Sequence, residues 1–363
     1  MLKYLRWLPA ILLIVLAACA PGGVGARLPD ANAPTPSQAQ APQGQVLQGQ
    51  APQAQAPQSQ GAQAPSSQAQ IVPTLLAQAT TAPPAATPLP TLLTITASDT
   101  NFRRPASVAV DKKGSIFVGD QMGVYQFDSA GKYVKTLVKV GTESGLRNPS
   151  GLAVASSGDV YIADNVVNTL FRVSPDGQIA SKMTSVGGKS LDQPVTVHVD
   201  PQNNVFVVNQ NSSEVLKLDS SGKLLMTIGS KGEKTGQFER PHGLALYRDG
   251  NIYVTDLTTS LIQKFGPDGK YIKSFGDSHS GENAWLLRGI GVGPDNRIYV
   301  VDGINQRIQV FDLTELRLIK EFSAPGMSQG LLQDPEDLAI DPDGNLYIAD
   351  RGNNRIQKIK LAL

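Results

Sequence analysis

The chain has 363 residues, of which 17% are charged, and its formal net charge is +1. This near balance excludes a basic surface suited to a phosphate backbone, so we expect no nucleic-acid partner. A single cysteine, Cys19, also excludes an internal disulfide.

Residues 1–18 have the pattern of an export signal, in which two basic residues precede an apolar run. The run is too short for a membrane-spanning helix, which needs about 20 apolar residues. It ends in Leu-Ala-Ala-Cys at 16–19, which resembles the bacterial lipobox. The resemblance implies cleavage before Cys19, lipid attachment to its thiol, and a cell-membrane or cell-envelope location on the extracytoplasmic face. The alternative is a plain secretory signal with an incidental cysteine.

Residues 19–90 form a low-complexity segment of Ala, Pro, Gln, Gly and Ser. Such a segment buries too little apolar surface to offset the entropy of ordering it. We therefore expect a disordered linker that holds a folded domain away from the lipid surface. The alternative is a proline-rich ligand for a partner's groove, but the segment holds no defined docking motif.

Between residues 91 and 363 a unit of short strands recurs six times. Successive units are 44 to 48 residues apart, a period typical of four-stranded propeller blades rather than of helical solenoids. Tight turns are expected at Asp341–Gly344, between the first two strands of a unit, and at Pro267–Gly269, between the last two. The second strands of the six units end at Asp120, Asp164, Asn209, Asp256, Asp302 and Asp350.

The last unit carries a family resemblance. It reads PEDLAIDPDGNLYIAD at 335–350 and NNRIQ at 353–357, and this resembles an NHL repeat almost throughout. The resemblance covers about residues 92–363 and implies an all-β fold, a six-bladed β-propeller. Individual units depart from the pattern, as at Leu287, where the other units have a proline.

The sixth unit has only three strands before the chain ends, so its outer strand must come from elsewhere. Leu92–Thr96 is an apolar-alternating segment ahead of the first unit, and we predict that it supplies this strand and joins the first blade to the last. Large and small residues alternate in the first strands, as in Leu338 and Ala339. We expect the large face of each blade to pack against the small face of its neighbour.

The residue after each unit's proline is expected at the mouth of the central channel, because the innermost strand of a blade begins at one face. Three adjacent units place His242, Arg288 and Glu336 there, opposite small or apolar residues. An imidazole, a guanidinium and a carboxylate that converge on a concave mouth could bind a small ligand. They could instead pair with one another as a solvated rim. A calcium site that uses Glu336 with other oxygen ligands is a third alternative.

The aspartates that end the second strands are expected at the same face. Asp302 and Asp350 are each followed five residues later by an arginine, Arg307 and Arg355. We predict bidentate pairs that brace the loops. Three aspartates without such an arginine are either capped by backbone N–H groups or free on the surface: Asp120, Asp164 and Asp256.

Two groups of enzymes share the propeller architecture. NHL-like amidating lyases hold a metal with histidines from several blades, and calcium lactonases use axial carboxylates and an asparagine. This chain has three histidines: His242 alone is in a ligand position, His198 is expected to be buried between blades, and His279 lies in a connection. A multi-histidine metal site cannot be built from them, and we expect no cofactor. The sequence also has no spacing typical of a nucleophilic triad or of a phosphate-binding glycine loop.

These patterns together predict a non-catalytic protein. We expect a monomeric, lipid-anchored propeller that offers its top face and channel mouth to a protein, a peptide or a cell-envelope glycan, as a binding or scaffold module. The main alternative is a metal-dependent lyase or a lactonase-like hydrolase that acts at the mouth. A sensor or assembly module is a third. The fold does not choose among ligands, because propellers host unrelated functions.

Overall fold

The computed structural model describes residues 88–96, 103–276 and 285–361. All of them belong to one unit of the chain, residues 77–363. The predicted signal peptide, Cys19, nearly all of the linker and His279 lie outside the described residues. Within the described ranges, no helix is long and apolar enough to cross a membrane.

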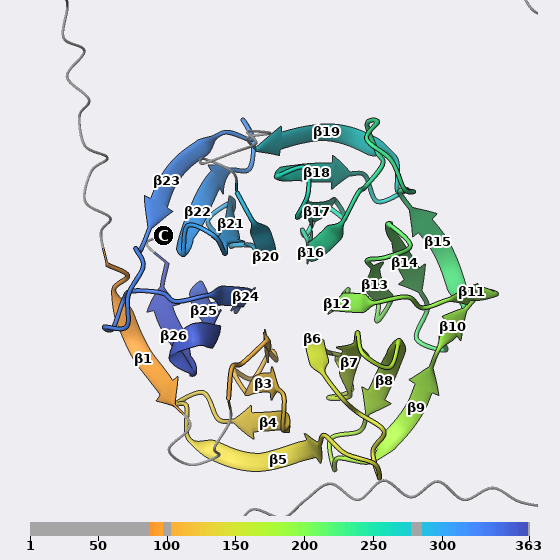
Figure 1. Cartoon of the computed structure of the whole chain (residues 1–363), viewed down its shortest axis with the longest axis horizontal. Coiled ribbons are helices and arrows are strands. Elements are labelled where there is room, and N and C mark those ends of the chain that lie inside the picture. Colours follow the sequence, from red (N-terminus) through yellow and green to blue (C-terminus); the bar gives the residue numbers. More distant parts are fainter. Residues whose placement is uncertain (1–87, 97–102, 277–284, 362–363) are drawn as a thin grey trace, which may run out of the picture. The chain divides into compact units, whose positions relative to one another are not determined.

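Six four-stranded antiparallel sheets are arranged in a ring (Figure 1). Each sheet is one blade, with its first strand next to the central axis and its last strand on the circumference. In five of the sheets the four strands follow one another along the chain. The predicted all-β, six-bladed propeller is therefore confirmed, because each repeat supplies one local sheet.

Short strands form the blades, and within each blade they are ordered from the axis outward. Blade 1 has β2 (Ser107–Val110), β3 (Ile116–Asp120), β4 (Gly123–Phe127) and β5 (Tyr133–Lys139); blade 2 has β6 (Pro149–Val154), β7 (Val160–Asp164), β8 (Thr169–Val173) and β9 (Ile179–Met183); blade 3 has β12 (Pro194–Val199), β13 (Val205–Asn209), β14 (Glu214–Leu218) and β15 (Leu224–Ile228). Blade 4 has β16 (Pro241–Leu246), β17 (Ile252–Asp256), β18 (Leu261–Phe265) and β19 (Tyr271–Gly276); blade 5 has β20 (Leu287–Val292), β21 (Arg297–Asp302), β22 (Arg307–Asp312) and β23 (Leu318–Phe322); blade 6 has β24 (Pro335–Ile340), β25 (Asn345–Asp350), β26 (Arg355–Lys360) and β1 (Thr91–Thr96).

Further short elements lie in connections. The strands β10 (Ser185–Val186) and β11 (Lys189–Ser190) form a hairpin between blades 2 and 3. The 3-10 helix η2 (Arg351–Asn353) follows β25. We call the face at which the innermost strands begin the top face, and η2 lies there because the second strand of a blade ends where the first begins.

Tight turns join the strands at the opposite face, as predicted. Between β24 and β25, the Gly344 N–H donates to the Asp341 carbonyl at 3.0 Å and the Asn345 N–H donates to Asp341 Oδ1 at 2.8 Å. Gly344 has φ of 73°, a left-handed conformation that glycine adopts without steric cost. The turn at Pro267–Gly269 separates β18 from β19 in the same way.

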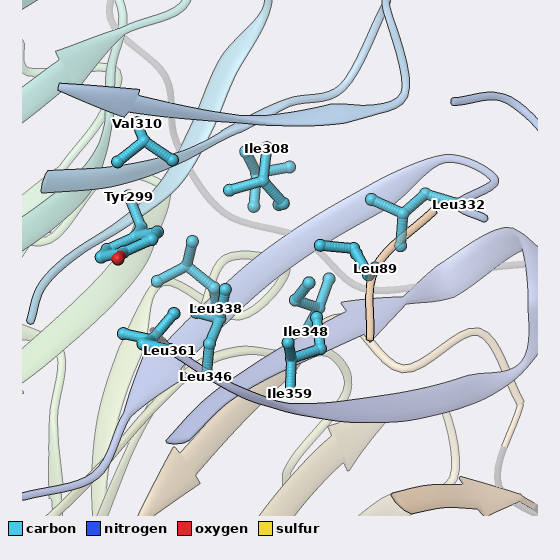
Figure 2. Packing of buried hydrophobic residues seen from close by; sticks show 11 residues of the cluster. Leu89, Tyr299, Ile308, Val310, Leu332, Leu338, Leu346, Ile348, Ile359 and Leu361 are labelled. Atoms are coloured by element: carbon cyan, nitrogen blue, oxygen red, sulfur yellow. The ribbon is translucent and has the colours of Figure 1, made fainter. Parts of the chain in front are cut away.

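Apolar clusters fill the spaces between neighbouring blades. Figure 2 shows the cluster between blades 5 and 6, in which Leu338 of the innermost strand lies with Tyr299 and Val310 of the preceding blade. Ala339, the next residue, packs on the other side against a cluster that includes Val108 of blade 1. The predicted packing of a large face against a small face is confirmed, since successive residues of a strand point to opposite faces.

The ring closes through β1, the orange strand in Figure 1. It pairs antiparallel with β26, with Thr94 opposite Gln357 and Thr96 opposite Arg355. The prediction that Leu92–Thr96 supplies the missing strand of blade 6 is therefore confirmed. The packed segment begins slightly earlier than predicted, because Leu89 is also buried and its N–H donates to the Gly330 carbonyl at 3.0 Å.

Candidate functional site

Three adjacent innermost strands place polar side chains at the top of the central channel. His242, Arg288 and Glu336 are the second residues of β16, β20 and β24. Arg288 Nη1 lies 2.9 Å from Glu336 Oε2, and His242 Nε2 lies 3.6 Å from Glu336 Oε1. Each side chain is only 15% or 16% exposed. The structure thus brings the three predicted residues into one partly buried cluster.

Glu336 is the centre of this cluster. Arg351 Nη1 of η2 lies 2.7 Å from Glu336 Oε2, so both carboxylate oxygens face donors. Burial raises the pKa of Glu336, but the hydrogen bond from His242 and the charges of His242, Arg288 and Arg351 outweigh burial and lower the pKa to about 2. The group is therefore ionised at neutral pH and is a weak proton acceptor.

Arg288 belongs to the cluster but is not among the residues that line the pocket at the mouth. Its Nη1 also contacts Asp334 Oδ1 at 2.8 Å and donates to the Pro335 carbonyl at 2.9 Å. Its guanidinium runs so close to Gly303 that a Cβ atom there would come within 2.7 Å of Arg288 Nε. This arginine holds blade 5 against blade 6, and the position of its charge is fixed by these contacts.

Two further arginines complete the mouth, and reasoning from the repeat alone missed them. Arg351 directly follows the strand-ending Asp350, and Arg104 directly precedes the first repeat's proline. Arg104 Nη2 lies 3.1 Å from Asp334 Oδ2, and its N–H donates to Asn354 Oδ1 at 2.7 Å. Arg104 has φ of 53°, which is uncommon for a residue other than glycine. The sequence did hold a signal for these two residues: one basic residue stands next to a repeat's proline, and the other stands next to a strand-ending aspartate.

A pocket of about 130 Å³ opens at this mouth. One wall carries the charged groups of blades 6 and 1, and the other carries amide side chains of blades 1 and 2. Within the described part of the chain, His242 Nδ1 is buried without a hydrogen-bond partner. The lining residues are Arg104, Ala106, Gln121, Asn148, Ser150, Asn165, Val195, His242, Glu336 and Arg351.

A second cavity, of about 200 Å³, lies along the axis between the six innermost strands. Asp337 of β24 and His198 of β12 line it. The sequence predicted His198 to be buried between blades; instead it borders the axial cavity, because its blade has a histidine where the others have Ala or Gly. Burial raises the pKa of Asp337 to about 7 and lowers the pKa of His198 to about 4.

Asp337 also links the last blade to the first. Its Oδ2 accepts the Val108 N–H of blade 1 at 3.1 Å. The equivalent position is glycine in blades 2, 4 and 5, where the neighbouring strand approaches closely: a Cβ atom on Gly289 would lie 2.7 Å from Asp337 Cα. Asp337 was not singled out from the sequence, because its partner belongs to the first blade.

Asp302 and Asp350 each pair with the predicted arginine through one nitrogen. Arg307 Nε lies 3.0 Å from Asp302 Oδ2, and Arg355 Nε lies 2.7 Å from Asp350 Oδ2. The predicted bidentate geometry is wrong, because the remaining guanidinium nitrogens have other acceptors. Arg307 Nη1 contacts Glu321, and the Nη atoms of Arg355 donate to carbonyl oxygens of the loop between blades 5 and 6. The arginines still brace these loops.

The strand-ending aspartates without an arginine are buried and capped by the backbone. Asp164 accepts the N–H groups of Arg147 and Asn148 at 2.6 and 2.9 Å, and that of Val166 at 3.0 Å. Asp120 and Asp256 accept equivalent N–H groups from the loops of blades 1 and 4. Of the two alternatives left by the sequence, the structure has the capped one.

Among the described residues, no group of three or more His, Cys, Asp or Glu side chains is arranged to hold a metal ion. Glu336, which the sequence offered as a calcium ligand, instead directs its oxygens at two arginines and His242. The groups around the Glu336 carboxylate are hydrogen-bond donors, which hold it as an anion.

Comparison with known proteins identifies the type of repeat. The family model for the NHL repeat matches residues 146–179, 238–265 and 332–359, which lie mainly in blades 2, 4 and 6. The protein brain tumor of Drosophila melanogaster is 30% identical over 125 residues, which are 33% of this chain and 11% of that protein. NHL repeat-containing protein 3 of Homo sapiens is 25% identical over 133 residues, 36% of this chain and 38% of that protein. The chain thus spans well under half the length of these relatives.

Solved structures show the same fold at low identity. Virginiamycin B lyase from Staphylococcus aureus is 16% identical with a TM-score of 0.54, over 74% of this chain and 99% of that one. A gluconolactonase from Xanthomonas campestris is 16% identical with a TM-score of 0.56, over 76% of this chain and 97% of that one. At these identities the likeness shows the fold alone.

Proposed function

We propose that this six-bladed β-propeller with NHL repeats is a membrane-anchored binding module outside the cytoplasm. Its top face and channel mouth would receive a protein, a peptide or an envelope glycan. The observation that carries the proposal is the break in six-fold repetition at the mouth. There, Arg104, Glu336 and Arg351 line one pocket with His242, and Arg288 pairs with Glu336.

Binding is favoured over catalysis by the state of the pocket's acidic group. Glu336 has a pKa of about 2, lowered by His242, Arg288 and Arg351 against the opposing effect of burial. A carboxylate this acidic is a poor general base, because the pKa of a general base should lie near the working pH.

The alternative is a metal-dependent lyase or lactonase-like hydrolase acting at the mouth. Metal analysis of protein purified in dilute chelator separates the two, because only the enzyme requires a retained ion.

The mouth should lose its ligand when the central cluster is removed. We expect the triple variant His242→Ala, Arg288→Ala, Glu336→Ala to capture the wild-type partner from envelope extract with at least about tenfold lower yield, because a few central residues contribute most of the binding energy of an interface. The matched control is Lys112→Ala with Lys113→Ala, two exposed residues in the turn between β2 and β3. Equal recovery of the same partner by the triple variant would rule out the mouth.

The anchor is proposed from the lipobox and the short apolar run of residues 1–18. Treated as a flexible coil, a linker of about 70 residues would span roughly 45 Å, and more where prolines stiffen it. Such a linker leaves the propeller free to meet ligands away from the lipid surface. Two or three acyl chains hold a protein on a membrane stably, whereas one does so only marginally.

Replacing Cys19 with Ala should abolish lipid incorporation and leave the chain uncleaved at that point. The reason is that the thiol is the strong nucleophile in the motif. Metabolic labelling with a radioactive fatty acid, followed by membrane fractionation, measures both effects. A labelled, membrane-bound variant of normal mature size would refute the anchor.

A further inference from the structure

We infer that the mouth pocket recognises a carboxylate carried on an apolar group, such as the carboxy terminus of a peptide that ends in apolar residues. This inference rests on the proposed function, because it takes the mouth as the binding site, and it names the chemistry of the ligand. Three features support it: the charge balance of the mouth, the unused donors in the pocket and the apolar rim on one side of it.

The mouth holds more positive than negative charge. Three arginines, Arg104, Arg288 and Arg351, share two carboxylates, Asp334 and Glu336, at distances between 2.7 and 3.8 Å. Among these five groups, one positive charge is therefore left over. The surplus fits a ligand with a single negative charge. It does not fit a doubly charged phosphate equally well, because the two carboxylates would repel the second charge.

The two arginines that line the pocket use only part of their donors in these ion pairs. Arg104 makes its ion pair through Nη2, and Arg351 makes its contacts through Nε and Nη1. The Nη2 group of Arg351 and the Nη1 group of Arg104 have no partner within the described part of the chain. Guanidinium groups bind carboxylates through paired N–H donors, so these groups are suited to receive one.

The opposite wall supplies neutral hydrogen-bonding groups. Asn148 Nδ2 donates to Asn165 Oδ1 at 2.8 Å, which fixes both amides at the pocket's edge. Gln121 also lines the pocket. A peptide backbone or an equivalent polar group that follows the carboxylate could hydrogen-bond to this wall.

An apolar rim adjoins that wall. Met122 and Val166 directly follow the lining residues Gln121 and Asn165, and they are 56% and 63% exposed. They occupy the same position in the top-face loops of blades 1 and 2, two residues after the strand-ending aspartate, as Ile304 does in blade 5. An apolar group attached to the bound carboxylate would cover them and bury surface that now faces water.

The test uses the full chain purified in detergent and three probes of defined chemistry. The first is the peptide acetyl-Ala-Val-Leu-Val with a free carboxy terminus, the second is the same peptide with a terminal amide, and the third is octanoate. Calorimetric titration at low ionic strength should give at least about tenfold tighter binding of the acid than of the amide. Octanoate separates the two sources of the carboxylate: binding as tight as that of the peptide acid identifies a free carboxylic acid, and weaker binding identifies a peptide terminus.

Variants then assign the effect to the pocket. Arg104→Gln and Arg351→Gln should each weaken binding of the peptide acid about tenfold and leave the amide unchanged. Arg147→Gln is the matched control, because Arg147 is exposed on the same face and lies outside the pocket; it should bind as the wild type does. Melting temperatures show whether each variant is folded.

Two results would overturn the inference and are distinguishable from failure of the proposed function. Equal binding of acid and amide, with loss of both in the triple mouth variant, would show that the mouth binds peptides without reading the carboxylate. No binding of any of the three probes would also reject the inference. The capture experiment with envelope extract would still decide whether the mouth is a binding site.

Discussion

A chain that begins at Thr100 should unfold at a much lower temperature than one that begins at Pro88. The shorter chain lacks β1 and with it the buried side chains of Leu89 and Ile95, which are 5% and 4% exposed. Burial of two such side chains contributes about 3 to 6 kcal/mol. For a domain of this size we therefore expect the melting temperature to fall by roughly 6 to 12 °C.

Removal of β1 has a second cost besides lost apolar contacts. It exposes the edge of β26 from Arg355 to Ile359, which now pairs with β1, and it unlinks the first blade from the last. An exposed apolar strand edge also promotes association of chains. We expect the shorter chain to aggregate on heating, which light scattering measures alongside the melting curve.

Point variants on the same strand provide a matched test. Ile95→Ala should cost about 2 to 5 kcal/mol, as other aliphatic truncations in packed cores do. Leu92→Ala should change the free energy of unfolding by less than about 0.5 kcal/mol, since Leu92 is 60% exposed. Equal melting temperatures for chains beginning at Thr100 and Pro88 would show that blade 6 is complete without β1.

Replacing Asp337 with Asn should change how stability depends on pH. Burial raises the pKa of Asp337 from 3.8 to about 7. The folded state therefore holds the proton more tightly than the unfolded state, and the stability that this gives is fully present below pH 4 and is lost as pH rises to 7. A difference of about three pKa units corresponds to about 4 kcal/mol. Relative to the wild type, Asp337→Asn should gain up to about 4 kcal/mol between pH 4 and pH 7.

His198 should act in the opposite direction over nearly the same range. Burial lowers its pKa from 6.5 to about 4. Its contribution is present above pH 6.5 and is lost as pH falls to 4, by up to about 3 kcal/mol. Relative to the wild type, His198→Ala should therefore lose stability as pH rises from 4 to 6.5. In the wild type, the opposite effects of the two groups on the pH dependence of stability partly cancel. Near pH 5.5 both groups are neutral, because this pH lies below the pKa of Asp337 and above that of His198.

Urea unfolding at pH 4.5, 5.5, 6.5 and 7.5 measures both slopes. Glu336 does not interfere, because its pKa is held at about 2 and its contribution changes only below about pH 4.5. Variant-minus-wild-type differences that change with pH in the same direction for Asp337→Asn and His198→Ala would contradict these assignments. So would differences that do not vary with pH.

The sequence by itself determined the architecture, because the signals for it are local and repeated. A turn such as Asp341–Gly344 requires only neighbouring residues, and the alternation of Leu338 and Ala339 follows from the two faces of a strand. Repetition then multiplies each weak signal. Even ring closure by Leu92–Thr96 could be predicted, since a strand was missing at one end of the chain and spare at the other.

The candidate site was only partly determined by the sequence. Equivalent positions in adjacent repeats placed His242, Arg288 and Glu336 at one mouth, and the structure brings them into contact. The sequence did not show that Arg288 pairs with Asp334 and does not line the pocket, whereas Arg104 and Arg351 do. Those positions depend on non-repeating loops, whose conformations are set by neighbours from other blades rather than by the repeat.

Only the tertiary structure decided the chemistry of the axis. Asp337 meets Val108, a residue more than two hundred positions earlier in the chain, and His198 faces the axial cavity from blade 3. The pKa values of these two groups are set by burial, which arises only when all six innermost strands surround the axis. A residue's type and spacing do not contain that information, because the solvent around a group is removed by residues that are distant in the sequence.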